Sequence, residues 1–519
     1  MIVEDQSQTI AFLADSASYA EFGAAGPVER LDTHTSIVFL AGDRAYKLKR
    51  AVRFSYLDYS TVERRLEACQ NELVLNRRTA PRLYLKVRRI CRAPNGRLAF
   101  GGSGPTVDCI VVMRRFEQSA LFDDMARRGA LTRPLMRDLA DHIASFHHAA
   151  EIDLRYGGRV GLLAVIQSNA SNLALAGPGI FDAEVIESLT KASTAIVERS
   201  ADFLEGRRRS GKVRLCHGDL HLRNICLIDA RPTLFDCVEF SRAIATIDVL
   251  YDLSFLLMDL QHRRLGDLSN LVFNRYFDRE EEVEGAGTLP LFMSMHAAIR
   301  AHVQVAAMAA QLDELARERL AGEAGDYLAL ATSLLGKTAP RLIAVGGFSG
   351  TGKSTLAMAL AQEVGQAPGA RVLRSDVIRK RMMGVAPETP LPAEAYTEAI
   401  NRGVYASLMD EGRRLLAVGH SVIADAVCAR PEERGAMAEL ALGQGCPFTG
   451  LWLEAPPGLL EARLGARVRD ASDATADVLR EQLHRGAGIV EWHHVDAAKG
   501  AEAVLQVARN LLDAVINPQ

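Results

Sequence analysis

The chain has 519 residues, of which 48% are apolar and 24% are charged, and its formal net charge is −3. At roughly 150 residues per domain this length predicts two or three compact units, and the composition is typical of a globular protein. A charge so close to zero excludes a strong general attraction for nucleic acid or for an anionic membrane, so we expect neither as a partner.

Cysteines and apolar runs indicate the compartment. No two of the eight cysteines form a C-x-x-C pair, which argues against a zinc or redox site and fits a reducing environment. The N-terminus lacks the basic and apolar segments of a secretory signal, and the longest apolar run, 249–260, is interrupted by Asp252 and Asp259. We therefore expect a cytoplasmic protein.

The first part of the chain predicts a small antiparallel sheet with one helix, followed by helices. Two β-rich runs flank Ala41-Gly42-Asp43, which is a hairpin signal. In chain order the predicted elements are a helical lead (1–30), strands (36–40 and 44–49), a helix (61–78), strands (83–90, 97–100 and 107–113), helices (121–204), a strand-and-loop stretch (213–240) and helices (247–335).

Near residue 338 the pattern changes to strands that alternate with helices. The predicted strands are 341–345, 371–374, 421–424 and 449–453. This alternation predicts a parallel sheet covered on both faces. The predicted domains are therefore 1–335, with lobes at 31–115 and 116–335, and 338–519.

A phosphate-binding loop is the clearest motif of the second domain. Residues 347–354 read Gly-Phe-Ser-Gly-Thr-Gly-Lys-Ser, a complete G-x-x-x-x-G-K-[ST] between an apolar strand and a predicted helix at 355–363. Its backbone N–H groups would surround phosphate oxygens, its lysine would reach the β- and γ-phosphates, and its serine would bind Mg²⁺. The alternative, a glycine-rich turn with a surface lysine, does not account for this context. The expected ligands of ATP and Mg²⁺ are Gly347, Ser349, Gly350, Thr351, Gly352, Lys353, Ser354 and Thr355.

Acids and arginines follow the later strands of the same domain. Ligands of open α/β sheets bind at the carboxyl ends of strands, so Asp376 is placed to accept a proton from a substrate hydroxyl, and Asp425 to hold Mg²⁺ or contact substrate. The alternative for either acid is a helix N-cap. Basic residues here would neutralise the transferring phosphoryl group, or else lie on solvated helix faces. They are Arg379, Lys380, Arg381, Arg430, Arg434, Arg463, Arg467 and Arg469.

The first domain carries a second constellation suited to phosphoryl transfer. His217-Gly-Asp219-Leu-His-Leu-Arg-Asn224 is followed by Asp236, which gives H-x-D-x-x-x-x-N and then D. Asp219 would orient the acceptor hydroxyl as the catalytic carboxylate. Asn224 and Asp236 would bind magnesium.

A lysine for the α- and β-phosphates is expected upstream. Lys47 lies in a predicted strand, and Glu72 on the following helix would orient it through an ion pair. Lys49 projects from the same face of that strand, so the choice between the two lysines stays open.

These motifs resemble two known families. Residues 31–335, with the loop HGDLHLRN, resemble the aminoglycoside phosphotransferase and choline kinase-like family. Asp252 matches an acid of that family, and we expect it to bind backbone. Residues 341–515 resemble the small P-loop kinases, such as gluconate, shikimate and adenylylsulfate kinases and zeta toxins, which are often labelled AAA family ATPases. RSDVIRK at 374–380 looks like their substrate-binding acid and arginine, and 463–474 like their lid.

The resemblance implies a fold class of α/β and α+β, with a bilobal protein-kinase-like domain followed by a P-loop NTPase domain. The leading hypothesis is a tandem ATP-dependent phosphotransferase that acts on small-molecule acceptors. Departures leave other hypotheses open: no G-x-G-x-x-G precedes Lys47, Leu222-Arg223 replaces Pro-Gly, and Cys237 follows the metal acid. One alternative is a P-loop ATPase or kinase regulated by an N-terminal ligand-sensing pseudokinase. Another is a toxin-like kinase of sugar nucleotides. The acceptors and the oligomeric state are not predicted.

Overall fold

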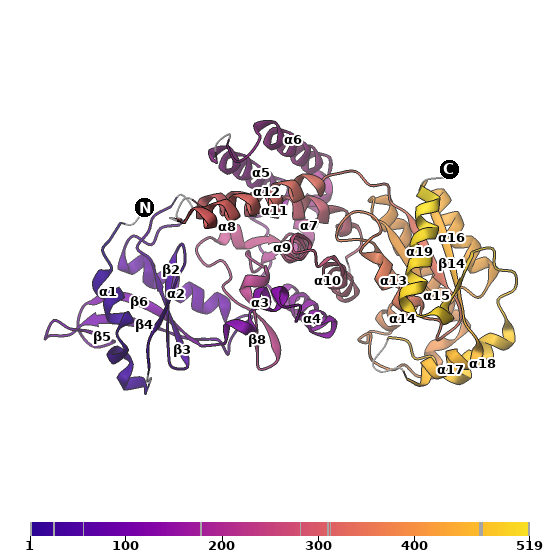
Figure 1. Cartoon of the computed structure of the whole chain (residues 1–519), viewed down its shortest axis with the longest axis horizontal. Helices are drawn as coiled ribbons and strands as arrows, with labels where there is room; N and C mark the ends of the chain where they lie inside the picture. The colour runs from indigo at the N-terminus through magenta and orange to yellow at the C-terminus, as the bar shows by residue number, and fades with distance from the viewer. Residues whose placement is uncertain are drawn as a thin grey trace. The chain divides into compact units, whose positions relative to one another are not determined.

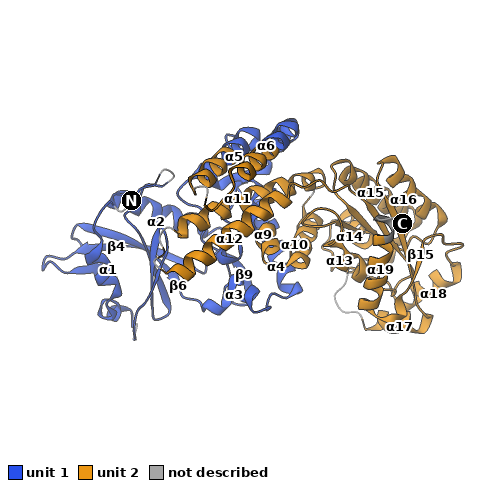
Figure 2. Cartoon of the chain, turned by 45° about the horizontal axis from the view of Figure 1, so that its top comes forward, with its two compact units in different colours: residues 1–165, 194–256 blue, residues 166–193, 257–519 orange. Residues whose placement is uncertain are grey.

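The computed structural model describes residues 3–23, 26–54, 57–176, 179–280, 282–308, 311, 313–466 and 471–516. The chain divides into two compact units, residues 1–165 with 194–256 and residues 166–193 with 257–519 (Figure 2). This division assigns the helices of 257–335 to the second unit. The domain limits at 335 and 338 rest on the change of sequence pattern and stay a prediction.

An antiparallel sheet of order β1-β2-β3-β6-β4-β5 forms the beginning of the first unit (Figure 1). The hairpin between β2 and β3 turns at Gly42, whose φ of 57° is accessible to a residue without a Cβ atom. The strands are β1 (Glu29–Asp32), β2 (Ser36–Ala41), β3 (Arg44–Lys49), β4 (Tyr84–Arg92), β5 (Leu98–Phe100) and β6 (Thr106–Arg114).

Both faces of this sheet are covered, because its strands alternate between two apolar clusters. Leu40 and Val111 pack with Cys69 of α2 (Val62–Asn76) on one face. Phe39 packs with Tyr19 of η1 (Ser16–Phe22) on the other face, where α1 (Ser7–Ala14) also contributes. The period of two along each strand thus fixes the register of the hairpin that carries Lys47.

The rest of the first unit consists of helices and two short two-stranded ladders. β7 pairs antiparallel with β10, and β8 pairs antiparallel with β9. The H-x-D-x-x-x-x-N motif occupies the connection between β7 and β8. The elements are η2 (Gln118–Ala120), α3 (Phe122–Arg127), α4 (Arg133–Ala149), α7 (Ala201–Arg207), η3 (Arg208–Lys212), β7 (Val213–Leu215), η4 (Leu222–Asn224), β8 (Ile225–Ile228), β9 (Arg231–Leu234), α8 (Arg242–Ala245) and β10 (Thr246–Asp248).

Helices make up the first part of the second unit. Three of them continue across the division between the units: α5 (Gly158–Leu175), α6 (Ala183–Arg199) and α9 (Val249–His262). The others are α10 (Gly266–Arg279), η5 (Glu284–Thr288), α11 (Leu289–Met308) and α12 (Glu314–Ser333), and α11 packs along α12.

A five-stranded parallel sheet of order β12-β13-β11-β14-β15 forms the centre of the P-loop region. Its middle strand reads Leu-Ile-Ala-Val-Gly and is buried throughout, as expected for a strand covered on both faces. The strands are β11 (Leu342–Gly346), β12 (Arg371–Arg374), β13 (Val422–Asp425), β14 (Phe448–Glu454) and β15 (His493–Asp496). The helices are α13 (Lys353–Ala361), α14 (Ser375–Met382), η6 (Ala393–Tyr396), α15 (Glu398–Ala417), α16 (Pro431–Gly443), α17 (Pro457–Gly465), α18 (Ala476–Arg485), η7 (Ala497–Lys499) and α19 (Ala501–Ile516).

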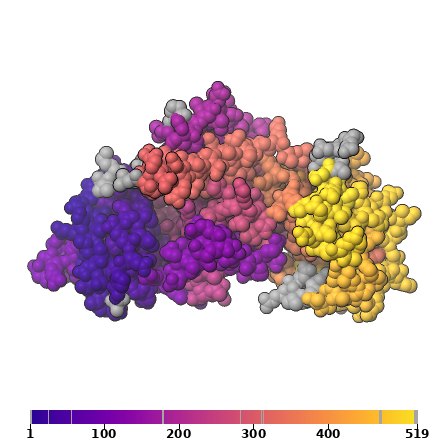
Figure 3. Space-filling view, in the orientation of Figure 1, coloured from indigo at the N-terminus to yellow at the C-terminus, as the bar shows by residue number. Residues whose placement is uncertain are grey.

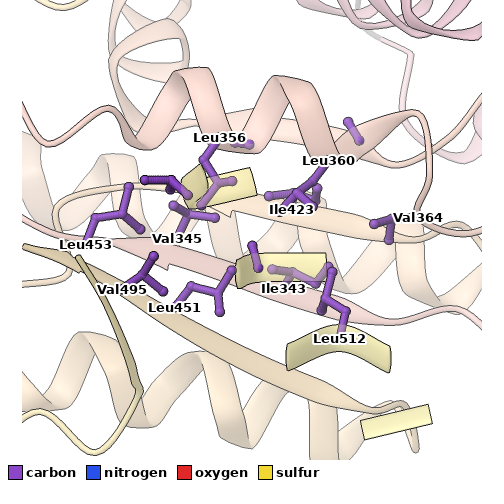
Figure 4. Close-up of a cluster of buried hydrophobic side chains, with 14 of the residues drawn as sticks. Ile343, Val345, Leu356, Leu360, Val364, Ile423, Leu451, Leu453, Val495 and Leu512 are labelled. Atoms are coloured by element: carbon purple, nitrogen blue, oxygen red, sulfur yellow. The ribbon is translucent and has the colours of Figure 1, made fainter. Parts of the chain in front are cut away.

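The core of this region lies between one face of the sheet and helices α13 and α19. Figure 4 shows Ile343, Val345 and Leu453 of the sheet packed with Leu356 and Leu360 of α13. The outward side of α19 is exposed and forms the yellow surface in Figure 3. The strand that precedes the P-loop is therefore anchored by buried side chains on both sides of its backbone.

The predicted fold class is confirmed, with an antiparallel kinase-like sheet near the N-terminus and a parallel P-loop sheet near the C-terminus. Three strands were not predicted: β1, β10 and β15. β1 and β15 are largely exposed edge strands without an apolar run, and β10 lies where the predicted helices of 247–335 begin. Among the residues described, no helix combines the length and the apolar character needed to cross a bilayer.

Candidate functional site

An ion-pair network joins β3 to α2 in the first unit. Lys47 Nζ lies 2.9 Å from Glu72 Oε1 and 2.5 Å from Asp236 Oδ1. Lys49 Nζ lies 2.7 Å from Glu72 Oε2 and also pairs with Glu239. Glu72 thus serves both lysines, and only Lys47 contacts the acid of the predicted metal site.

Burial and pairing act in opposite directions on these groups. Burial alone would lower the pKa of Lys47, but the carboxylates of Asp236 and Glu72 hold that pKa well above its usual range. For Glu72, burial would raise the pKa, but Lys47 and Lys49 lower it to about 2. Both lysines and the glutamate are therefore charged at neutral pH, and the network is a fixed set of paired charges.

The loop between β7 and β8 brings together the next two predicted residues. The Asn224 amide nitrogen donates to Asp219 Oδ2 at 2.7 Å and to the Asp219 carbonyl at 3.0 Å. The amide oxygen of Asn224 takes no part in these two bonds. The Asp219 side chain is 39% exposed, so its carboxylate is accessible to an acceptor.

Asp252 supports this loop from behind. Its carboxylate accepts hydrogen bonds from the backbone N–H of His217 at 3.2 Å and of Gly218 at 2.8 Å. It also binds His147 Nε2 at 2.9 Å. Burial would raise the pKa of Asp252, but the bond to His147 lowers it. The expectation that Asp252 binds backbone is confirmed.

One buried group of possible metal ligands lies here, formed within the described chain by His147, Cys216 and Asp252. The carboxylate of Asp252 already accepts the three bonds given above, and the Cys216 thiol faces the Ile247 carbonyl at 3.6 Å. We assign this group a structural role, because the Asp252 carboxylate, its best cation ligand, already binds His147 and the backbone of His217 and Gly218.

The donor set at Asp236 and Asn224 fits Mg²⁺, which prefers carboxylate and amide oxygens. Asp236 follows β9 in a left-handed conformation with φ 60°, which is unusual for a residue other than glycine. Its backbone N–H donates to Tyr84 Oη at 3.1 Å, and the next N–H, of Cys237, donates to Asn76 Oδ1 at 3.0 Å. These bonds hold an uncommon backbone turn that presents a half-exposed carboxylate.

In the second unit the P-loop is held by close backbone packing. Gly347 has φ 133°, and a Cβ atom there would lie 2.5 Å from the Leu453 carbonyl oxygen. Lys353 Nζ donates to the Phe348 carbonyl at 3.0 Å, so the lysine folds back over its own loop. The Ser349 N–H donates to Gln482 of α18 at 2.9 Å. Only glycine fits the start of this loop.

The predicted metal ligands of this unit meet directly. Ser354 Oγ donates to Asp425 Oδ2 at 2.6 Å. Arg374 Nε lies 3.3 Å from the same carboxylate oxygen, and another guanidinium nitrogen lies 3.1 Å from Ser354 Oγ. A hydroxyl and a carboxylate side by side are hard-oxygen ligands that suit Mg²⁺. Asp425 is thus part of the loop site, not a helix cap.

Asp376 faces the same cavity as the P-loop. It lies in the first turn of α14, whose N-cap is Arg374, so it is not a helix cap either. Burial, with the nearby Asp425 charge, raises the pKa of Asp376, whereas Arg374 lowers it. The cavity has a volume of about 1920 Å³, and its lining includes Lys353, Ser354, Asp376 and Asp425.

The predicted basic residues separate into several groups. Lys380 is buried and pairs with Asp473 at 3.0 Å, and Arg381 pairs with Glu411. The others bond as follows: Arg430 pairs with Glu398, Arg434 donates to four backbone carbonyls, and Arg463 donates to the Ala497 carbonyl. Arg467 and Arg469 lie outside the described residues. Most of these residues therefore bind other parts of the chain, whereas the alternative expected for each was a solvated helix face.

Arg379 differs from them. Its side chain is buried and lines the cavity one turn after Asp376. Its guanidinium lies 4.7 Å from the ring centre of Tyr396, and one nitrogen donates to the Ala395 carbonyl at 2.9 Å. Nε has no hydrogen-bond partner, and no carboxylate within the described part of the chain pairs with Arg379.

Sequence patterns missed two residues of this site. Gln482 and Tyr396 support or line the cavity, yet neither belongs to a motif with an assigned role. Both come from distant helical segments, and only the folded chain brings them to the P-loop. Arg374 opens the predicted RSDVIRK motif, but its contacts with Ser354 and Asp425 were not predicted.

Comparison with known proteins identifies a P-loop domain in the C-terminal part of the chain. A family model described as an AAA domain matches residues 342–487, which confirms the P-loop resemblance. Similar solved structures include a choline/ethanolamine kinase family protein from Mesorhizobium loti, 16% identical, covering 62% of this chain and 98% of that chain with a TM-score of 0.36. A gluconokinase from Sinorhizobium meliloti 1021 is 23% identical and covers 34% of this chain and 98% of that chain, with a TM-score of 0.24.

The uncharacterized protein Rv2004c of Mycobacterium tuberculosis is similar along almost the whole chain. It is 30% identical over 476 residues, which cover 90% of this chain and 92% of the relative. The chain belongs to the same family as this protein.

Proposed function

We propose that the chain is a tandem ATP-dependent phosphotransferase, in which each module transfers the γ-phosphate of ATP to a small-molecule acceptor with Mg²⁺. The observation that carries the proposal is the cavity shared by Lys353, Ser354, Asp376 and Asp425, which joins a phosphate loop, hard-oxygen ligands and an acceptor-side carboxylate. The Asp219 site offers hard-oxygen ligands and an acceptor-side carboxylate from unrelated residues, with Lys47 in place of the phosphate loop.

In the second unit the backbone N–H groups of the P-loop and Lys353 bind the phosphates, and Ser354 with Asp425 would hold Mg²⁺. When bound, this ion neutralises charge on the β- and γ-phosphate oxygens. Asp376 takes the proton of the acceptor hydroxyl as the new O–P bond forms and the bond to the β-phosphate oxygen breaks. The raised pKa of Asp376 makes it a stronger proton acceptor than an exposed aspartate.

In the first unit Asp219 takes the equivalent role toward its own acceptor. Asn224 and Asp236 would hold Mg²⁺, and Lys47 contacts the phosphates. Glu72 fixes the direction of the Lys47 side chain. We choose Lys47 over Lys49 because its ammonium lies between Glu72 and Asp236, whereas Lys49 pairs with Glu239.

The acceptor of the second unit carries an anionic group under this proposal. Arg379 supports this, since its buried guanidinium lines the cavity one turn from Asp376 and pairs with no carboxylate among the residues that the structure describes. A carboxylate or phosphate of the acceptor would satisfy it. Arg467 as a further phosphate ligand stays a prediction.

The test is transfer of label from [γ-³²P]ATP to a metabolite library by the full chain and by Lys353→Ala and Asp219→Asn. We expect two classes of labelled product, each lost in one variant only, by about 10²-fold or more. Products lost equally in both variants, or in neither, would contradict two independent sites. Circular dichroism of each variant controls for unfolding.

A second candidate function is regulation of the P-loop site by an N-terminal pseudokinase. One observation favours it: the connection between β1 and β2 is a tight turn closed by the Thr33 N–H and the Ser36 carbonyl at 2.9 Å, where a glycine-rich loop would cover the phosphates. ATP turnover that is lost in Lys353→Ala and unchanged in Asp219→Asn, with no Asp219-dependent product, would favour this function.

A further inference from the structure

Helix α18 meets the P-loop through one polar and one apolar contact. Gln482 Oε1 accepts a hydrogen bond from the Ser349 N–H at 2.9 Å. Phe348, the preceding residue of the loop, packs against an apolar cluster that contains Leu460 of α17 and Leu479 of α18. Ser349 is only 6% exposed, so water has little access to it. The conformation of the first half of the P-loop therefore depends on α18.

Asp473 anchors the stretch before α18 on the other side of the cavity. Its carboxylate pairs with Lys380 Nζ at 3.0 Å and accepts from the Leu391 N–H at 3.1 Å and from Tyr396 Oη at 2.6 Å. The Lys380 side chain is 1% exposed, so this pair is not a loose surface contact. The ring of Tyr396 lies 4.7 Å from the Arg379 guanidinium. Asp473 is thus fixed beside the group that we propose to bind the acceptor.

The segment 473–482 is packed along its length. Ala474 and Phe348 both pack against the apolar cluster of α17 and α18. Thr475 is the N-cap of α18, and Leu479 within that helix is completely buried. Since closely packed side chains transmit displacements, a shift at one end of this segment reaches the other end.

We propose that Gln482 and Asp473 are positioning residues of the P-loop site, an inference that rests on the proposed function of that site. Gln482 holds the Ser349 N–H, and with it the start of the P-loop, in the conformation that receives the phosphates of ATP. Asp473 holds the segment that carries Gln482. The affinity of the P-loop for ATP therefore depends on contacts made on the acceptor side of the same cavity.

The variant Gln482→Met tests the first contact, because it keeps the length of the side chain and removes the amide oxygen. The Ser349 N–H then lacks its acceptor, and the loop relaxes until that donor finds another partner. ATP has to restore the original conformation, and this cost lowers its affinity. We expect ATP to bind about tenfold more weakly, the effect of one buried hydrogen bond.

Binding is measured by isothermal titration calorimetry of the full chain with ATP and Mg²⁺. The P-loop site is the site whose binding is lost in Lys353→Ala. The matched control is His484→Met, the same replacement at an exposed position of α18, and it should bind ATP like the parent chain. Circular dichroism of each variant controls for unfolding.

The variant Tyr396→Phe tests the second contact without leaving Lys380 buried and unpaired. It removes one hydrogen bond to Asp473 and keeps the ring beside Arg379. We expect ATP to bind about threefold more weakly, since this bond supports the P-loop only through the segment 473–482. In a chain that also carries Gln482→Met, Tyr396→Phe should have almost no further effect, because the segment no longer holds the loop. A role in stability alone would not produce this dependence in ATP affinity.

Three results would overturn the inference and leave the proposed function intact. Unchanged ATP affinity in Gln482→Met, or an equal loss in His484→Met, would exclude positioning by Gln482. Tighter binding in Gln482→Met would make Gln482 a competitor of the phosphates. Additive effects of Tyr396→Phe and Gln482→Met would exclude the link through Asp473. Absence of any ATP binding that depends on Lys353 would overturn both the inference and the proposed function.

Discussion

The two candidate nucleotide sites position their lysine side chains through different kinds of contact. In the first unit Lys47 is held by the side-chain carboxylates of Glu72 and Asp236. In the second unit Lys353 donates a hydrogen bond to the Phe348 backbone carbonyl, and the conformation of the P-loop depends on glycines. The first site should therefore be sensitive to the loss of a charge, and the second to the addition of a single carbon atom.

Removal of Glu72 should have the largest effect on stability. Glu72→Ala leaves Lys47 and Lys49 buried without the carboxylate they share, and breaking a buried pair in this way costs about 3–5 kcal/mol. Chemical denaturation of the full chain should show the loss in a transition that belongs to the first unit. Glu67→Ala on the exposed side of α2 is the control and should change little. Equal stability of the two variants would show that the network contributes no net stability.

Acid should destabilise the second unit through a buried imidazole. Burial, with the charge of Arg371, lowers the pKa of His420 from 6.5 to about 4, so the unfolded chain binds the proton more tightly than the folded one. Stability is therefore lost as pH falls from 6.5 to about 4, by about 3 kcal/mol for one group with this shift. His420→Leu should flatten this part of the stability–pH profile, measured by denaturation at several pH values.

The exposed His484 provides the control for this profile. His484→Leu removes an exposed side chain of α18 and should keep the slope of the parent chain. A slope that His420→Leu leaves intact would assign acid sensitivity to other groups.

A single methyl group should disturb the P-loop site. Gly347→Ala places a Cβ atom 2.5 Å from the Leu453 carbonyl oxygen at φ 133°, so either the loop or β14 must shift. We expect a loss of about 2 kcal/mol in stability and weaker ATP binding by titration calorimetry. The control is Gly458→Ala in α17, where a Cβ meets nothing within 4 Å and should stabilise the helix slightly. Unchanged ATP affinity in Gly347→Ala would mean that the loop tolerates a side chain.

The parts of each site that the sequence predicted are those encoded in short segments. The hairpin around Gly42, the P-loop and the loop from His217 to Asn224 all follow from local patterns, and the structure has them where expected. The choice between Lys47 and Lys49 did not follow, because both side chains share a strand face and only Asp236, 189 residues away, distinguishes them.

Contacts between segments distant in the sequence were likewise out of reach. The bond from Lys380 of α14 to Asp473, which follows α17, joins two segments 93 residues apart whose proximity depends on the fold. Strand β15 was not predicted because its sequence, His-His-Val-Asp, is mostly polar; it lies at an edge of the sheet. Edge strands of this kind lack the apolar run by which the buried strand β11 was recognised.

The smallest expected loss of stability concerns Asn274 of α10, whose side chain makes hydrogen bonds to backbone groups at the edge strand β12. Asn274 of α10 accepts from the Val372 N–H at 2.8 Å and donates to the Ala370 carbonyl at 3.2 Å, and so covers the edge strand β12. Asn274→Ala leaves the Val372 N–H without this acceptor, while the Ala370 carbonyl keeps its bond from Asn270 Nδ2, and should cost about 1 kcal/mol. Hydrogen exchange at Val372 should accelerate, while exchange in β11 should not. Arg279→Ala, exposed at the end of α10, is the control. Strand β12 leads directly to Arg374 and Asp376. A measurable fall in ATP turnover in Asn274→Ala but not in Arg279→Ala would therefore show that α10 supports the backbone of this site. Equal hydrogen exchange in the two variants would show that this support comes from the P-loop sheet alone.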